Sequence, residues 1–130
     1  MKRWRDWWKQ ALADAEHARY ALKAGHYEWA CFAAQQAAEK ALKACLNRLG
    51  KAAYGHVLLR LLQGIRESGV EVPADLEDAA KILDKFYIPT RYPNGLAEGA
   101  PTEFYTRQEA ENAIGLAEQI LRFCANHLDR

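Results

Sequence analysis

The spacing of apolar residues along the chain predicts helices almost throughout. In the first 25 residues, apolar side chains recur at alternating intervals of four and three, which places them on one face of a helix. The positions on this face are Trp4, Trp8, Ala11, Ala15, Ala18 and Leu22. We expect this first helix to end near Gly25.

A second helix is predicted from about Tyr27 to Leu49, and it carries two adjacent apolar stripes. One stripe consists of small residues, namely Ala30, Ala34, Ala37, Ala41 and Ala44. Because small side chains let helices approach closely, we expect the first two helices to pack as an antiparallel hairpin. Gln35 lies in the other, otherwise apolar stripe. A buried amide needs hydrogen-bond partners, so Gln35 is either a structural bridge or a site residue.

Three more helices follow from capping and stop signals. The patterns predict helices from about His56 to Ser68, between Pro73 and Pro89, and from a Thr106/Glu109 capping box almost to the C-terminus. Residues 87–105 form a long connection with three prolines, two glycines and four aromatic residues. The predicted fold is therefore all-α, a single domain over residues 1–130. We expect an up-and-down four-helix bundle with one shorter additional helix and a long aromatic loop before the last helix.

Composition agrees with this prediction and narrows the function. The chain contains 24 alanines but only 8 glycines and 4 prolines, which favours helices. Its 18 Lys and Arg residues nearly balance 17 Asp and Glu residues, so any nucleic-acid contact must come from a local patch. The N-terminal ten residues are charged and no apolar run is long enough to span a membrane, so we expect a cytoplasmic protein without membrane contact. Three cysteines without Cys-x-x-Cys spacing predict reduced core residues, and neither a metal site nor a cofactor is expected.

Three segments resemble the HEPN (higher eukaryotes and prokaryotes nucleotide-binding) family. They are residues 27–44, 56–62 and 83–94. The resemblance is specific in the second helix and in a Thr-Arg-Tyr-Pro turn at residues 90–93, which is similar to the branch that includes the C-terminal domain of sacsin. The second-helix residues concerned are Phe32, Gln35, Gln36, Ala37, Glu39 and Lys40.

The resemblance implies a helical bundle that is usually a homodimer. Many bacterial members are encoded beside a minimal nucleotidyltransferase, and such pairs are associated with toxin-antitoxin function. We therefore expect a nucleotide- or RNA-binding module, or a partner subunit of a minimal nucleotidyltransferase. One alternative is a metal-independent ribonuclease toxin, and another is a purely structural subunit of a complex.

The ribonuclease alternative depends on an Arg-x4-His pair, Arg122 and His127, which meets the spacing of the family's nuclease signature. There, His would act as acid or base on a 2′-hydroxyl while Arg neutralises the phosphate. Phe123 replaces the usual polar neighbour, and Asp129 stands where the transferase-paired toxins carry tyrosine. Five residues on a regular helix turn through about 500°, which leaves the pair about 140° apart. The other interpretation is a helix C-terminus whose cations offset the dipole.

The nucleotide-binding interpretation centres on Arg91, which the sequence surrounds with Tyr87, Tyr92 and Tyr105. An arginine among aromatic residues can hold a phosphate bidentately while a ring stacks on a base. The alternative is structural: Arg91 pairs with Asp84 or Glu103, and the tyrosines pack in the core. Both interpretations stay open at this point.

Other polar residues are candidates to border a ligand-binding cleft beside Arg91. Gln36, Lys40 and Lys43 lie on the polar side of the second helix, where they either contact the ligand or form a solvated face. His56 opens the predicted third helix, where free N–H groups attract anions, or else it acts as a cap. Trp29 projects from the flank of the second helix, which predicts a dimer or partner surface there.

Overall fold

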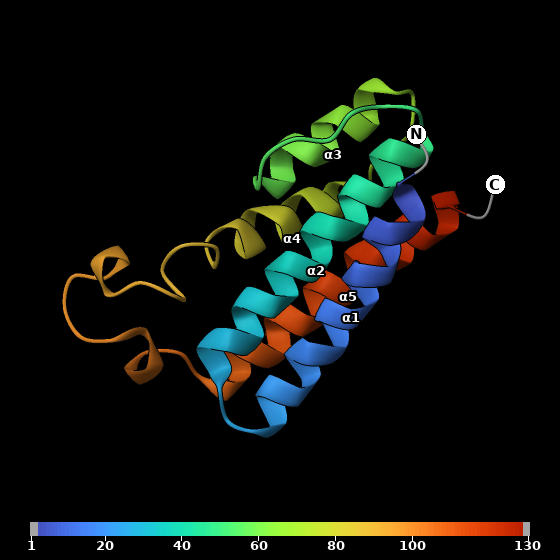
Figure 1. Ribbon diagram of the computed structural model, residues 1–130. Coiled ribbons are helices and arrows are strands. Elements are labelled where there is room, and N and C mark those ends of the chain that lie inside the picture. The colour runs from blue at the N-terminus through green and yellow to red at the C-terminus, as the bar shows by residue number, and fades with distance from the viewer. Residues whose placement is uncertain (1–2, 129–130) are drawn as a thin grey trace.

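The computed structural model describes residues 3–128, which form an all-helical bundle with no strand in that range. The three long helices are α1 (Trp4–Lys23), α2 (Tyr27–Arg48) and α5 (Arg107–Leu128). The two shorter helices are α3 (Leu58–Glu67) and α4 (Ala74–Asp84). Two 3-10 turns, η1 (Pro93–Gly95) and η2 (Pro101–Glu103), lie in the connection to α5. The predicted bundle with a long loop before the last helix is confirmed (Figure 1).

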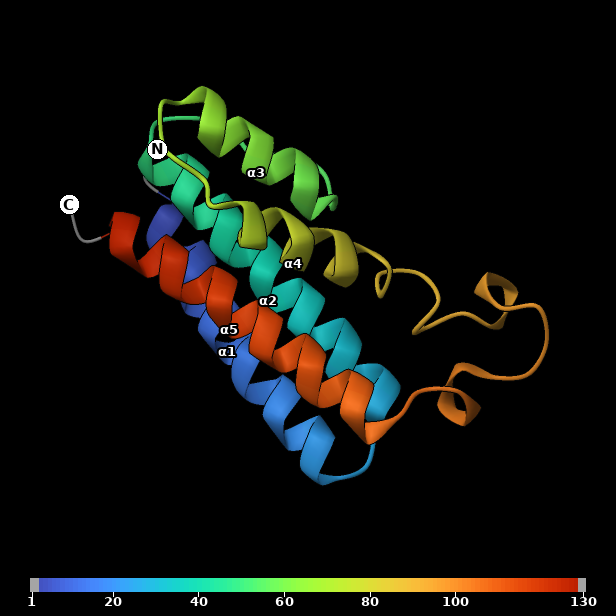
Figure 2. The same cartoon turned by 180° about the vertical axis from the view of Figure 1, so that it is seen from behind.

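Helix α2 lies at the centre of the bundle, and residues along almost its whole length are buried. It packs against α1 and α5 along its length and against α3 and α4 on its remaining side (Figures 1 and 2). The predicted antiparallel α1–α2 hairpin is present, and its turn uses Gly25 at a φ of +81°. The small-residue stripe from Ala30 to Ala44 is buried, which allows the close helix approach that the sequence indicated.

The connection between α4 and α5 extends beyond one end of the bundle (Figure 2). Buried Thr90 holds its first part, because the Thr90 hydroxyl donates a hydrogen bond to the carbonyl of Phe86. Pro101 is also buried. Because Thr90 and Pro101 are buried and η2 contacts α2, both parts of the connection lie partly against the body of the protein.

Two helix boundaries differ from the sequence prediction, and one agrees with it closely. Helix α3 begins at Leu58 rather than His56, because the Asp84 carboxylate accepts the backbone N–H groups of Leu58 and Leu59. Helix α4 ends at Asp84, well before Pro89. The capping box before α5 is confirmed by hydrogen bonds between Thr106 and Glu109.

The three cysteines, Cys31, Cys45 and Cys124, are buried and free. Burial raises the pKa of the Cys31 thiol to about 12. Of the helices within residues 3–128, none is long and apolar enough to cross a membrane.

Candidate functional site

The most distinctive arrangement of side chains surrounds Arg91. Its guanidinium carbon lies 4.2 Å from the ring centre of Phe32, 4.6 Å from that of Tyr87 and 5.1 Å from that of Tyr92. We call these four residues the Arg91 cluster. Phe32 projects from α2, and the other three residues come from the segment after α4. Cation–π contact therefore holds a partly buried positive charge at the junction of α2 and the loop.

The Arg91 guanidinium is positioned by backbone rather than by a carboxylate. Its Nε–H donates a hydrogen bond to the Tyr87 carbonyl at 2.9 Å. Asp84 caps α3, while Glu103 accepts the Ala100 backbone N–H at 3.0 Å. Among residues 3–128, no acidic side chain forms an ion pair with Arg91, so neither Asp84 nor Glu103 pairs with it. Its terminal amino groups are not engaged by the described residues.

A second group of polar side chains lies beside the Arg91 cluster and is organised by Glu39. The Glu39 carboxylate is 4% exposed and lies 3.1 Å from Nδ1 of His56 and 3.2 Å from Nζ of Lys43. Nε2 of Gln36 donates to Glu39 at 3.3 Å and to Oε1 of Gln35 at 2.8 Å. Gln35 in turn donates to the His56 carbonyl at 3.1 Å. We call these five residues the Glu39 network.

Tyr87 joins the two groups. Its ring stacks on the His56 imidazole at 4.6 Å with an interplanar angle of 20°, and its other contacts are with Phe32 and Arg91. The fully buried Gln35 is thus a bridge between α2 and the backbone at His56. A continuous set of polar and aromatic groups consequently runs from Lys43 to Tyr92.

A surface pocket of about 430 Å³ is lined by His56 and Tyr87 together with Val57, Ile88 and Asp84. Burial raises the pKa of the Asp84 carboxyl, while hydrogen bonds from two backbone N–H groups act in the opposite direction and the nearby Glu39 charge adds to the rise. The Asp84 carboxylate already accepts the N–H groups of Leu58 and Leu59 at the start of α3, beside His56.

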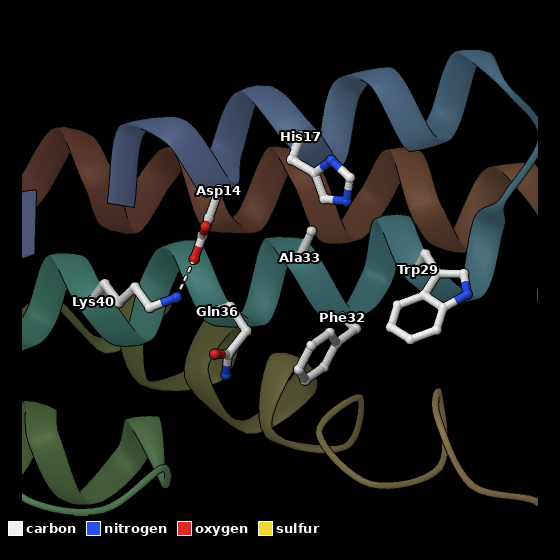
Figure 3. Close-up of a pocket in the computed structure, with 7 residues that line it drawn as sticks. All are labelled: Asp14, His17, Trp29, Phe32, Ala33, Gln36 and Lys40. Atoms are coloured by element: carbon white, nitrogen blue, oxygen red, sulfur yellow. Dashed lines mark hydrogen bonds and ion pairs between the residues drawn. The ribbon is translucent and has the colours of Figure 1, made fainter. Parts of the chain in front are cut away.

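A smaller pocket of about 180 Å³ lies between α1 and α2 (Figure 3). In Figure 3, the ammonium group of Lys40 points to the Asp14 carboxylate, with which it forms an ion pair. Phe32 and Gln36 of α2 also line this pocket. Lys40 is therefore paired with α1, whereas Phe32 borders both this pocket and the guanidinium of Arg91.

The remaining predicted site residues lie elsewhere. Tyr105 packs edge-on against Phe86 at 6.1 Å and makes no ring contact with Arg91, and burial raises its pKa. Arg122 is exposed, while His127 bonds through Nδ1 to the Phe123 carbonyl and packs on the Phe123 ring. No contact joins Arg122 to His127, as expected for side chains on different faces of α5. Asp129 lies outside the described residues.

Sequence reasoning missed the Glu39 network as a unit. Lys43, for which the sequence allowed a ligand contact or a solvated face, is buried between Glu39 and the Trp7 ring, 5.1 Å from the ring centre. The spacing of Glu39 and Lys43, four residues apart on a helix, was the available signal. His56 could not be connected to them because its partner comes from a different element. Within residues 3–128, no three His, Cys, Asp or Glu side chains gather in a way that could hold a metal ion.

The fold and the site define a small helical domain with a cation–aromatic cluster at the junction of its central helix and its long loop. The family model of the HEPN domain matches residues 4–128 of the chain. The chain is also 30% identical over 128 residues to a Methanocaldococcus jannaschii protein named "Putative toxin MJ1304", covering 92% of this chain and 84% of that protein. This protein therefore belongs to the HEPN domain family.

Solved structures agree with this assignment. TT1696 from Thermus thermophilus, whose crystal structure is known, is 52% identical in sequence to this chain. The two structures match with a TM-score of 0.95 over 98% of this chain and 100% of that chain. ST0689, described as an archaeal HEPN homologue, is 44% identical, with a TM-score of 0.84 over 98% of this chain and 99% of that chain. An HEPN domain protein from Thermotoga maritima is 42% identical, with a TM-score of 0.77 over 96% of this chain and 98% of that chain.

Proposed function

We propose that this HEPN domain binds a nucleotide or the end of an RNA chain at the Arg91 cluster. The observation that carries the proposal is the state of Arg91. Three rings and one backbone bond fix its guanidinium, yet no acidic side chain in the described part of the chain neutralises it. Such a preorganised fork of N–H donors suits a phosphate, which it can bind through two parallel hydrogen bonds.

The rings beside Arg91 supply a place for a base. Tyr92 is 48% exposed and its ring centre lies 5.1 Å from the Arg91 guanidinium carbon, so a ligand can reach the side chain beside the cation. Base stacking on an exposed aromatic ring is sequence-tolerant and adds about 1–3 kcal/mol per base. With a net charge of only +1, the protein lacks the broad basic surface that a long duplex requires. A mononucleotide or an RNA end therefore fits better than an extended nucleic acid.

We also propose that a second protein covers the flank of α2, in keeping with the toxin name of the M. jannaschii relative. The partner is a second copy of this chain or a minimal nucleotidyltransferase encoded nearby, acting with it as a toxin-antitoxin pair in the cytoplasm. Trp29 supports this, because its ring is 46% exposed and lies edge-on against Phe32 at 6.1 Å. Light scattering during size-exclusion chromatography tests the dimer: we expect the wild type to be dimeric and Trp29→Ala to dissociate, and a monomeric wild type contradicts it.

Isothermal titration calorimetry tests the ligand half of the proposal. The titrants are nucleoside mono- and triphosphates and a short single-stranded RNA. Losing a charged hydrogen-bond partner costs about 1.5–3 kcal/mol, so we expect Arg91→Ala to weaken binding about tenfold or more. Arg107→Ala is the matched control, since Arg107 also lies over a ring, 5.6 Å from the centre of Tyr27, outside the cluster.

Two results would contradict nucleotide binding at the Arg91 cluster. One is the absence of any binding by the folded wild type, which would favour the structural-subunit interpretation. The other is equal affinity in the wild type and Arg91→Ala. Arg91→Lys separates charge from geometry, because lysine keeps the charge but lacks the planar fork, and we expect it to restore only part of the affinity.

A further inference from the structure

The tryptophan-rich start of α1 is only partly covered by the rest of the bundle. On the apolar face of this helix, Ala11 and Ala15 are buried, whereas Trp4 and Trp8 are half-buried. One turn beyond Trp8, Leu12 is 48% exposed. Large apolar side chains therefore stay accessible at this end of α1, where they form one patch rather than scattered single residues.

These side chains line a surface groove of about 400 Å³ between α1 and α5. The start of α1 lies beside the end of α5, because the two helices run antiparallel (Figures 1 and 2). On the α5 side, the groove is lined by Ala125 and by Leu128, which is 4% exposed. Further along, Arg19 and Glu118 form an ion pair at 3.6 Å between the two helices. A polar contact thus replaces the apolar surface beyond the groove.

Two basic side chains also line this groove. Arg5 and Lys9 lie one turn apart on α1, and both are exposed. Within residues 3–128, neither forms an ion pair with an acidic side chain. Asp6, which lies between them in the sequence, pairs with Arg3 at 3.1 Å instead. The guanidinium carbon of Arg5 lies 4.5 Å from the centre of the Trp4 ring, which holds this charge beside the apolar surface.

The chemistry of the groove fits a helix better than a nucleic acid or a lipid surface. A groove between two neighbouring helices can receive a third helix, whose apolar residues recur at intervals of three and four. Leu12, Ala125 and Leu128 offer aliphatic contacts, which suit aliphatic side chains rather than bases. Two cations are few for a nucleic acid, since its binding strengthens with the number of phosphates neutralised. Trp8 packs against the core, so it is not free to enter a lipid surface.

We propose that the groove between the start of α1 and the end of α5 binds an acidic amphipathic helix of a partner protein. Leucine or phenylalanine side chains of the partner pack against Trp8 and Leu12, and its carboxylates pair with Arg5 and Lys9. Trp29 lies at the opposite end of the antiparallel α1–α2 hairpin, near the start of α2. Binding in the groove therefore requires neither the surface around Trp29 nor a nucleotide at the Arg91 cluster.

The experiment selects ligands for the immobilised full chain from phage-displayed random peptides of about four helical turns, the length of an average helix. We expect the selected sequences to share leucine or phenylalanine at helical spacing, with aspartate or glutamate beside them. A fluorescent synthetic peptide of the selected sequence then measures affinity by anisotropy. Its affinity for the wild type should fall as the salt concentration rises, because exposed charges are screened.

Charge-reversal variants test the two cations. Arg5→Glu combined with Lys9→Glu should weaken peptide binding at least about tenfold, because like charges then face each other. Lys23→Glu combined with Lys81→Glu is the matched control, since it changes the net charge equally at exposed positions outside the groove and should bind like the wild type.

A second pair of variants tests the apolar contact. Leu12→Glu should abolish peptide binding because it places a carboxylate in the groove. Ile82→Glu is its control, since Ile82 is 36% exposed on α4, outside the groove. Circular dichroism confirms that each variant is folded. Selected peptides that lack acidic residues, or a peptide that binds the wild type and the Arg5→Glu, Lys9→Glu variant equally, overturn the proposal.

Three other outcomes assign the groove to a different occupant and also overturn the proposal. If Leu12→Glu converts a dimer to a monomer in light scattering, the groove is an interface between two copies of this chain. If no peptide is selected, and phosphatidylserine vesicles bind the wild type but not the Arg5→Glu, Lys9→Glu variant, the groove contacts lipid. If no peptide is selected and the same variant loses affinity for a single-stranded RNA, the groove binds nucleic acid.

Discussion

The buried ion pair between Glu39 and Lys43 predicts a large and specific loss of stability when only one partner is removed. The two side chains are 4% and 9% exposed, and their charged atoms lie 3.2 Å apart. Replacing Glu39 by Leu leaves the Lys43 ammonium group buried without its counter-charge, although the Trp7 ring remains beside it.

The expected magnitude follows from burial. Removing one partner of a buried pair costs about 3–5 kcal/mol, which is a large share of a total stability of about 5–15 kcal/mol. Replacing both partners by apolar residues, as in Glu39→Leu with Lys43→Met, removes the unpaired charge. We expect this double variant to lie within about 2 kcal/mol of the wild type, so the second substitution should recover stability.

Urea unfolding followed by circular dichroism measures these differences. With a slope of about 2 kcal/mol per molar urea, Glu39→Leu should lower the midpoint by about 2 M. The exposed pair of Arg19 and Glu118 is the control, with side chains 50% and 43% exposed, and Glu118→Ala should cost no more than about 1 kcal/mol. If Glu39→Leu costs no more than Glu118→Ala, or if Lys43→Met adds a further loss, the reasoning is refuted.

Further predictions concern three single residues. Asp84→Ala should lower the stability by about 1 kcal/mol, because α3 loses its cap, and urea midpoints near neutral pH measure it. Burial raises the pKa of Asp84, so the folded state binds the carboxyl proton more tightly than the unfolded state does. The contribution of this proton to the free energy of unfolding should therefore fall as the pH rises from the ordinary carboxyl pKa through the raised pKa. This pH dependence should vanish in Asp84→Ala. Gln35→Ala should cost about 1–3 kcal/mol in urea unfolding because it leaves the His56 carbonyl without its partner, and a neutral effect would contradict the bridge. Cys31, with a pKa raised to about 12, should resist iodoacetamide at pH 8 in the folded protein and react in urea, as mass spectrometry of the peptide can show; rapid labelling of the folded protein would contradict its burial.

The parts of the fold that follow from periodicity could be predicted, because each helix reports its own buried face. The small-residue stripe of α2 indicated the hairpin, and the Thr106 capping box gave the start of α5. The start of α3 could not be placed correctly. Its cap comes from Asp84, which lies 26 residues further along the chain, and local patterns do not report such a partner.

The candidate site divides in the same way. Tyr87 and Tyr92 lie within four residues of Arg91, and the structure places them against it as their spacing suggested. Tyr105 is separated from Arg91 by two 3-10 turns and packs on Phe86 instead. In the Glu39 network, the spacing of Glu39 and Lys43 on α2 was a local signal. His56 comes from the segment before α3, so only the packing of the two elements brings it to Glu39.

The most direct test of nucleotide binding is a titration of the isotopically labelled protein with a nonhydrolysable short RNA analogue, followed by nuclear magnetic resonance. The Nε–H signal of Arg91 and the side-chain amide signals of Gln35 and Gln36 report the proposed site individually. We predict that these signals shift with a common dissociation constant, while the Nε–H signals of Arg107 and Arg122 stay in place. Shifts confined to Arg122 and the C-terminal end of α5, with Arg91 unchanged, would contradict the account.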